Sequence, residues 1–232
     1  MKLIELIDVY KIYNEGYENE VRALDGVSLS IDKGEFVAII GASGSGKSTM
    51  MNILGCLDIP TYGDYYLNGE YVADLTDRQL SRIRNREIGF IFQGFNLISG
   101  LNAYENVELP LIYLGVGASK RYDMTMTALE KVGLEDRCDH KPSEMSGGQQ
   151  QRVAIARAIA TGANIIMADE PTGALDSKTG QNVLEILHNL NREGTTIILI
   201  THDGSIAATA NRIVRIMDGK IIYDGPREAS GL

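Results

Sequence analysis

The sequence predicts an α/β fold in which a parallel sheet is covered by helices on both faces. Two compact apolar runs, residues 164–169 and 195–201, are separated by a helix-like stretch at residues 177–194. A third run, residues 36–42, leads into a glycine-rich turn and then a helical segment. Apolar runs that alternate with helices are typical of a parallel sheet buried on both faces.

The first third of the chain is predicted to be rich in β-strands. Residues 1–13 alternate between apolar and polar side chains and carry acids early, which favours a strand over a secretory leader. Val27, Leu29 and Ile31 alternate with polar neighbours in the same way. Residues 65–72 hold an Asn-Gly pair between strand-like runs, a pattern that predicts a β-hairpin.

The middle region, from about residue 93 to residue 161, lacks strong strand patterns and carries helix-like segments instead. One of these, residues 120–134, ends near Gly133, and glycine commonly stops a helix. The total of 232 residues suits one domain, so we expect residues 1–232 to form a single domain.

Composition and charge limit the classes of function. Hydrophobic residues make up 44% and charged residues 23%, as in ordinary globular proteins. The net charge of −9 opposes nucleic-acid binding, which depends on clustered Lys and Arg, so we expect no nucleic-acid partner. The longest apolar runs fall far below the ~20 residues of a membrane-spanning helix, and Cys56 and Cys138 match no metal or disulfide spacing. We therefore expect a cytoplasmic protein with reduced thiols.

Residues 35–55 predict a phosphate-binding loop between a buried strand and a helix. The turn matches G-x-x-x-x-G-K-[ST] at Gly41, Gly46, Lys47 and Ser48. Glycines let backbone N–H groups converge on phosphate oxygens, and the helix directs its positive end at them. Lys47 is expected to reach the β- and γ-phosphates and Ser48 to ligate Mg²⁺. The residues expected to contact the nucleotide are Gly41, Ala42, Ser43, Gly44, Ser45, Gly46, Lys47, Ser48 and Thr49.

A second apolar strand ends in two acids, Asp169 and Glu170. An isolated acid pair at a strand end is usually the solvated start of a loop. In a parallel sheet, however, the carboxyl ends of the strands share one edge, where ligands bind. We therefore expect Asp169 to hold Mg²⁺ and Glu170 to polarise the attacking water.

A further strand is followed directly by His202. This position predicts contact with the γ-phosphate at the same sheet edge. His140 and His188 have no such position and are interpreted as structural.

These motifs together resemble the ATP-binding cassette of ABC transporters. The phosphate loop, "IFQGF", "MSGGQQQR", "IIMADE", "GALD" and "THD" occur in the family's order and spacing. The resemblance implies a P-loop NTPase cassette: a RecA-like core, an N-terminal antiparallel β subdomain, and a helical subdomain inserted at about residues 93–161. It also implies ATP hydrolysis with Mg²⁺.

The resemblance assigns further roles. Tyr13 matches the aromatic that stacks on adenine, with a tyrosine packed in the β subdomain as the alternative, since Tyr10 and Tyr17 are close by. Gln93 matches the glutamine that touches Mg²⁺ and links the site to the membrane partner, and Asp176 matches the aspartate that communicates across the dimer. The residues expected to contact the ATP held by the other subunit are Ser146, Gly147, Gly148 and Gln149.

Two segments, "NILGCLDIPTYGDYYLNG" and "GFIFQGFNLISGLNAYENVELPLIY", resemble the branch of macrolide-efflux, lipoprotein-release and antimicrobial-peptide export ATPases. The resemblance implies a homodimer that closes on two ATP molecules and drives a separate membrane permease from the inner face of the membrane. One alternative keeps the ATPase but regulates cell-wall or division machinery through a membrane partner. A soluble ABC ATPase acting on DNA or ribosomes is disfavoured by the acidic charge.

Overall fold

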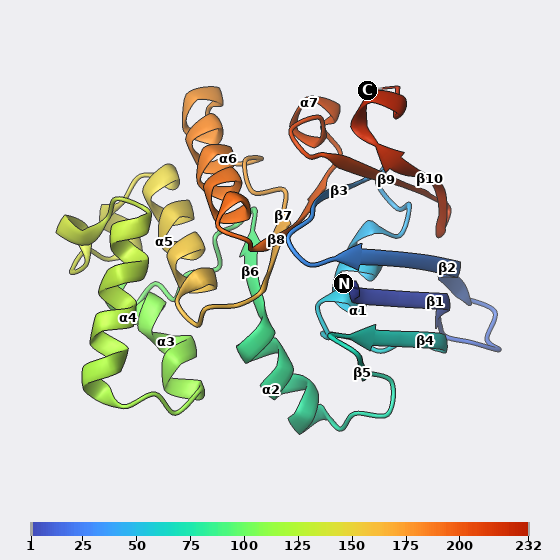
Figure 1. Ribbon diagram of the computed structural model, residues 1–232, viewed down its shortest axis with the longest axis horizontal. Helices are drawn as coiled ribbons and strands as arrows, with labels where there is room; N and C mark the ends of the chain where they lie inside the picture. The colour runs from blue at the N-terminus through green and yellow to red at the C-terminus, as the bar shows by residue number, and fades with distance from the viewer. Residues whose placement is uncertain (1, 232) are drawn as a thin grey trace. The chain divides into compact units, whose positions relative to one another are not determined.

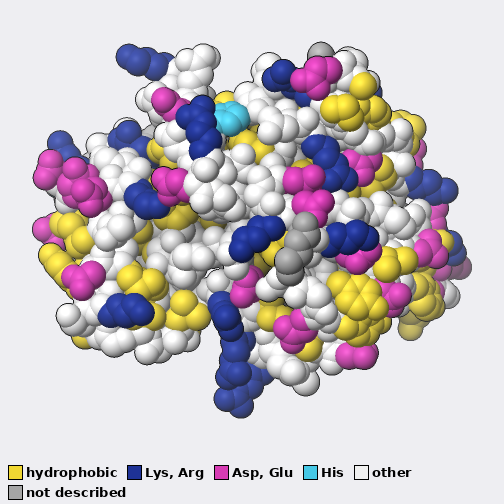
Figure 2. Space-filling model, in the orientation of Figure 1, with side chains coloured by type: hydrophobic (Ala, Val, Ile, Leu, Met, Phe, Trp, Pro, Cys, Tyr) yellow, Lys and Arg dark blue, Asp and Glu magenta, His cyan; other side chains and the backbone are white. Residues whose placement is uncertain are grey.

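The computed structural model describes residues 2–231, and the chain forms two compact units (Figure 1). The first comprises Met1–Arg84 with Thr196–Leu232, and the second comprises Asn85–Thr195. Among residues 2–231, no helix combines the length and apolar character needed to cross a bilayer. Figure 2 shows acidic and basic side chains interleaved over the visible face.

An antiparallel sheet forms much of the first unit. Its strands are ordered β2-β1-β4-β5, and their bounds are β1 (Lys2–Tyr13), β2 (Val21–Asp32), β4 (Tyr62–Leu67) and β5 (Glu70–Tyr71). Buried residues of β1 and β2 face each other in register, as Leu6 does with Leu29. The predicted hairpin joins β4 to β5, and Asn68 and Gly69 both have positive φ, as a two-residue hairpin turn requires.

Parallel strands form the other sheet of the first unit. β3 (Phe36–Ile40) lies parallel to both β8 (Thr196–Thr201) and β9 (Arg212–Met217), and β10 (Lys220–Pro226) is antiparallel to β9. Every residue of β3 and β8 is buried, which explains their continuous apolar sequences. The unit is completed by the helices α1 (Lys47–Leu54) and α7 (Gly204–Ala207) and the short 3₁₀ helix η3 (Arg227–Ala229).

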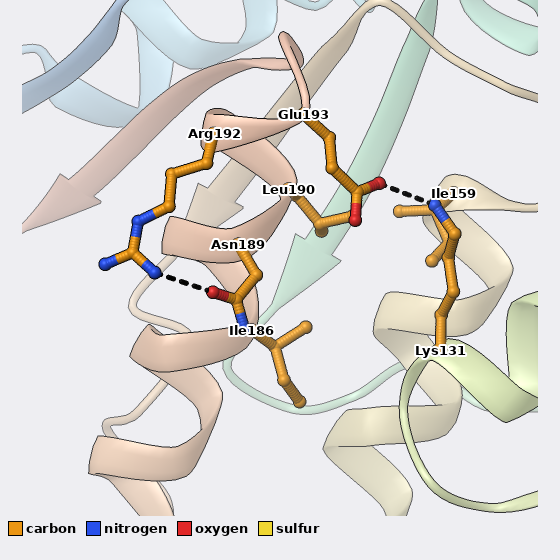
Figure 3. Close-up of a pocket in the computed structure, with 7 residues that line it drawn as sticks. All are labelled: Lys131, Ile159, Ile186, Asn189, Leu190, Arg192 and Glu193. Carbon is orange, nitrogen blue, oxygen red and sulfur yellow. Dashed lines mark hydrogen bonds and ion pairs between the residues drawn. The ribbon is translucent and has the colours of Figure 1, made fainter.

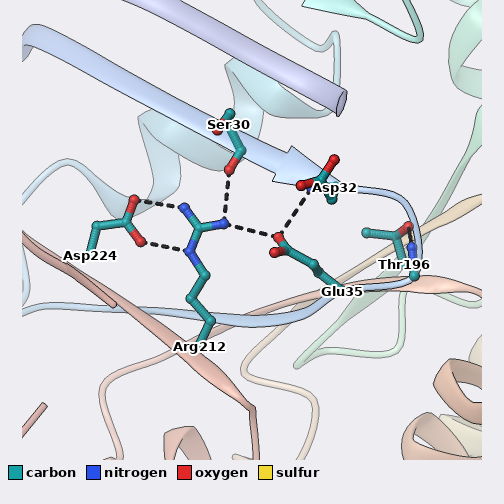
Figure 4. A network of polar contacts seen from close by, with 7 residues as sticks. Ser30, Asp32, Glu35, Thr196, Arg212 and Asp224 are labelled. Carbon is teal, nitrogen blue, oxygen red and sulfur yellow. Dashed lines mark hydrogen bonds and ion pairs between the residues drawn. The ribbon is translucent and has the colours of Figure 1, made fainter. Parts of the chain in front are cut away.

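Arg212 joins several of these strands (Figure 4). Its guanidinium donates two hydrogen bonds of 2.7 Å to Asp224 on β10, one of 3.0 Å to Glu35, and one of 2.9 Å to the carbonyl oxygen of Ser30 on β2. The bonds to Asp224 raise the pKa of Arg212. One side chain thus ties β2 and the residue before β3 to the β9–β10 pair.

The second unit combines two parallel strands with a group of helices (Figure 1). β6 (Ile88–Phe92) pairs in parallel with β7 (Ile165–Asp169). The helices are α3 (Ala103–Tyr113), α4 (Ala118–Lys131), α5 (Gly147–Ile159) and α6 (Ser177–Arg192), with 3₁₀ turns η1 (Glu135–Arg137) and η2 (Pro142–Glu144), while α2 (Asp77–Glu87) leads into β6. α5 contacts α3, α4, α6 and β6, so it is the central helix of this unit.

The predicted α/β class is confirmed, and the helices expected at residues 120–134 and 177–194 correspond to α4 and α6. α3, α4 and α5 fall within residues 93–161, and the inserted subdomain expected there stays a prediction. The β9–β10 hairpin was missed, although Asp218 and Gly219, which both have positive φ, form a turn signal between its strands.

Candidate functional site

The glycine-rich loop follows β3 and ends at the N-terminus of α1. Gly46, the N-cap of α1, has φ +105°, and a Cβ there would lie 2.5 Å from the carbonyl oxygen of Ala23, so only glycine fits. No side chain among the described residues caps this helix through its N-cap. The first N–H groups of α1 are therefore left to an external acceptor, as in anion sites at helix N-termini.

The Lys47 ammonium lies across the loop. It donates hydrogen bonds of 2.7 Å to the carbonyl oxygens of Gly41 and Ala42. An ammonium has three N–H donors, so these two bonds hold the positive charge over the loop and leave capacity for a phosphate oxygen.

A cavity of about 420 Å³ opens over this loop. Its lining includes Lys47, Ser48 and Thr49 from α1, together with Arg22 of β2 and Asp218 of the β9–β10 turn, two charged residues that the sequence motifs did not indicate. The volume falls in the usual range for a small-molecule site, roughly 300–1,000 Å³.

Ser45 supplies an independent indication that the loop receives a polar ligand. Its side chain is 4% exposed, and its Oγ has no hydrogen-bond partner among residues 2–231. A buried hydroxyl without a partner is uncommon, and a phosphate oxygen fits the chemistry of this loop.

Tyr13 ends β1 with its ring held in place. Its hydroxyl donates a 3.2 Å hydrogen bond to Asp58, and the Lys11 ammonium lies 5.1 Å from the centre of the ring. Tyr13 as a whole is 36% exposed, which leaves surface for stacking. By contrast, Tyr17 is 75% exposed, and Tyr10 lies against Gly26 with its pKa raised by Asp8.

His202 follows β8 at the same sheet edge as the loop. Ile40, the last residue of β3, pairs with Thr201, the last residue of β8. Because the strands are parallel, Gly41 and His202 both leave the sheet at this edge. The first unit therefore contains the loop, His202 and Tyr13.

In the second unit, Gln93 and the two acids are adjacent. Phe92 pairs with Asp169 at the ends of β6 and β7, so Gln93 and Glu170 leave neighbouring strands together. Gln93 then lies over Gly173, where a Cβ would meet its Nε2 at 2.8 Å. Glu170 has φ +46°, an unusual conformation for a residue other than glycine.

The Gln93 amide and the Asp169 and Glu170 carboxylates suit Mg²⁺ chemically, because oxygen atoms of these kinds are ligands of a hard cation. Over residues 2–231, no group of three His, Cys, Asp or Glu side chains is arranged to hold a metal.

Ser146 begins α5 with a capping box. Its Oγ accepts from the Gln149 N–H at 3.3 Å, and the Gln149 side chain accepts from the Ser146 N–H at 2.9 Å. Gly147 and Gly148 form the first turn, and a side chain at Gly148 would collide with Thr179 of α6. The glycine thus lets the starts of α5 and α6 pack closely.

Asp176 caps the start of α6. Its carboxylate accepts from the Lys178 and Thr179 N–H groups at 3.1 and 3.0 Å and from the Thr179 hydroxyl at 2.6 Å. The bonds from Thr179 lower the pKa of Asp176, so it is ionised at neutral pH. The second unit therefore contains Gln93, Asp169, Glu170, the Ser146–Gln149 turn and Asp176.

Another cavity, of about 470 Å³, lies among the ends of α4, α5 and α6 (Figure 3). An ion pair of 2.7 Å between Lys131 and Glu193 spans it, and Arg192 donates a 3.0 Å hydrogen bond to Asn189. None of the residues predicted for the site lines this cavity.

A strand, a glycine-rich loop and a helix that together form an anion cradle define a nucleotide-binding protein of the phosphate-loop class. Comparison with known proteins then gives the family. The family model for "ABC transporter" matches residues 24–173. The chain belongs to the ABC transporter family, as an ATP-binding and ATP-hydrolysing cassette, so the predicted resemblance and the predicted ATPase class are confirmed.

Two relatives and one solved structure illustrate the similarity. A macrolide export ATP-binding/permease protein of Mannheimia succiniciproducens is 56% identical over 97% of this chain, which covers 35% of that protein. An uncharacterized ABC transporter ATP-binding protein of Bacillus subtilis is 53% identical over 95% of both chains. A dimeric ATP-binding cassette in a post-hydrolysis state, bound to ADP and Pi, is 48% identical with a TM-score of 0.88, covering 97% of this chain and 98% of that one. The chain thus spans about a third of the length of the first of these relatives.

Proposed function

We propose that this chain works as one of two cassettes that close on two ATP molecules and drive export through a membrane permease. The observation that carries the proposal is the presence of two glycine-rich helix N-termini in one chain, α1 after Gly46 and α5 after Ser146. One nucleotide needs one such cradle, so a second in the same chain fits a site completed by another copy.

In this proposal the phosphate loop holds the triphosphate, with Lys47 compensating its negative charge. Ser48, Gln93 and Asp169 hold Mg²⁺, which neutralises charge on the phosphates when it is bound. Glu170 polarises the attacking water, His202 contacts the γ-phosphate, and Tyr13 stacks on adenine. Ser146, Gly147, Gly148 and Gln149 contact the ATP of the partner cassette, with Asp176 at the same interface.

Export is supported by the relative named as a macrolide export ATP-binding/permease protein. A permease partner would bring this cassette to the inner face of the membrane. The alternative of a cassette that regulates cell-wall or division machinery has no comparable support among these relatives.

The dimer is tested with Glu170→Gln, which keeps the side chain's shape and removes the basic carboxylate. We expect this variant to bind ATP without turnover and to elute as a dimer in gel filtration only when ATP is present. A monomer at saturating ATP and high protein concentration would contradict the two-cassette model.

The transport role is tested by purifying the tagged chain from membranes and identifying what accompanies it by mass spectrometry. We expect a permease subunit or domain. A wall-hydrolase regulator, with unchanged efflux on deletion of the gene, would favour the alternative.

A further inference from the structure

Gln151 is a fully buried amide whose bonding is incomplete. It lies on α5 with 0% exposure, and its Nε2 donates a short hydrogen bond of 2.6 Å to the carbonyl oxygen of Pro171. Its Oε1 is also buried, and no residue in the described range 2–231 offers it a partner. Leucine has nearly the same volume and brings no buried acceptor of its own, although it cannot donate to the Pro171 carbonyl oxygen. The bond to Pro171 is therefore the feature that distinguishes glutamine from leucine here.

Pro171 directly follows Glu170, and the backbone there is strained. Glu170 has φ +46°, and a residue that precedes proline is further disfavoured in helical conformations. Such a conformation persists only where the surrounding structure fixes it. A 3.0 Å hydrogen bond from the Gly173 N–H to the Glu170 carbonyl oxygen closes the turn, and the Gln151 bond holds the carbonyl between them.

The other end of this link is the start of α5. Gln151 lies just over one helical turn from the Ser146 cap, on a helix whose start packs tightly against α6 through Gly148 and Thr179. A displacement of the α5 N-terminus would therefore move Gln151 and, through its buried hydrogen bond, the Pro171 carbonyl group.

We propose that Gln151 is a positioning residue that fixes the orientation of the Glu170 carboxylate and couples it to the N-terminus of α5. The inference rests on the proposed function, in which Glu170 polarises water and Ser146 contacts the partner's ATP. Gln151 acts through the backbone of the Glu170–Gly173 turn, by its bond to the Pro171 carbonyl oxygen. In this way, contact between the start of α5 and the partner's ATP would set the orientation of the Glu170 carboxylate beside the ATP held by this chain.

The test is Gln151→Leu, which preserves volume and removes both the donor and the unpaired acceptor. We expect kcat to fall at least about tenfold, toward the ~10²- to 10⁴-fold loss typical of a missing general base. KM for ATP should change less than about twofold, and thermal stability should fall only slightly, because the Pro171 carbonyl oxygen loses its donor while the buried unpaired oxygen of Gln151 is removed. Asn164→Leu is the matched control: it removes a 2.7 Å amide bond to Glu87 at the opposite end of β7 and should keep wild-type kcat.

A second comparison separates positioning from a structural effect. In a Glu170→Ala background, Gln151→Leu should lower the residual hydrolysis rate no further, because residues that act as one unit are not additive. A further loss there, or wild-type kcat in the single variant, would overturn the proposal. Full activity of Glu170→Ala itself would instead overturn the role of Glu170, so failure of the inference and failure of the proposed function give different results.

Discussion

The hydroxyl of Tyr13 donates a hydrogen bond of 3.2 Å to the carboxylate of Asp58. The same carboxylate forms an ion pair of 2.6 Å with Lys11, whose side chain is only 12% exposed. The Lys11 ammonium also lies over the Tyr13 ring. The proposed adenine platform is therefore braced by the loop that follows α1, the helix of the phosphate loop. Ring position and phosphate cradle are linked through Asp58.

Tyr13→Ala should weaken ATP binding while leaving inorganic tripolyphosphate unaffected. Stacking of a base on an aromatic ring contributes ~1–3 kcal/mol, so we expect roughly a 5- to 150-fold higher Kd for ATP. Titration calorimetry with both ligands makes the comparison. Tyr17→Ala is the control, because Tyr17 is far more exposed, at 75%, and should leave both affinities unchanged. Equal weakening of both ligands would contradict a role in binding the base.

Lys47→Ala should abolish hydrolysis and weaken binding of ATP and tripolyphosphate alike. The ammonium is held over the loop by Gly41 and Ala42, and charge-assisted hydrogen bonds contribute ~1.5–3 kcal/mol each. We expect at least about a tenfold higher Kd by calorimetry. Lys120→Ala, on the exposed surface of α4, is the control for the loss of one positive charge. Normal turnover in Lys47→Ala would disprove the phosphate-loop assignment.

Features that local sequence determines were predictable. The buried strand, glycine turn and helix around Lys47 follow from hydrophobic periodicity and from glycines that permit positive φ, and the Asn68-Gly69 hairpin follows from turn chemistry. The placement of Asp169 and Glu170 at the end of a strand followed from a continuous apolar run. In each case the information lies within about twenty residues.

Features that depend on packing between distant segments were not predictable. Lys11 and Asp58 are 47 residues apart, and Gln151 and Pro171 are 20 apart, and no periodic pattern marks either pair. The positive φ of Glu170 is also hidden, because the sequence around it favours other conformations and only the folded surroundings hold it there. The residues that brace the proposed site were therefore missed, while those expected to contact phosphate were indicated by their motif.

Arg212→Lys should lower the free energy of unfolding although it keeps the charge. Lysine cannot reproduce the paired bonds to Asp224 together with those to Glu35 and the Ser30 carbonyl. Hydrogen bonds to charged groups contribute ~1.5–3 kcal/mol, and we expect a loss of about that size by urea denaturation. Arg78→Lys on the exposed face of α2 is the control and should change stability by less than about 0.5 kcal/mol. Unchanged stability in Arg212→Lys would show that the network contributes little.

Cys56 should be inert toward thiol reagents in the folded protein and reactive once it unfolds. The side chain is fully buried, and burial raises the pKa of its thiol from 9.0 to about 11, so almost none is thiolate at pH 8. Cys138 is partly exposed and serves as the internal comparison. We expect a disulfide reagent to titrate one thiol in native protein at pH 8, none in Cys138→Ser, and two in denatured wild type. Because the folded pKa lies above the unfolded one, the contribution of Cys56 to stability is complete below pH 9 and decreases as pH rises toward 11. Rapid labelling of Cys56 in native Cys138→Ser at pH 8 would show that the α1–β4 region opens readily.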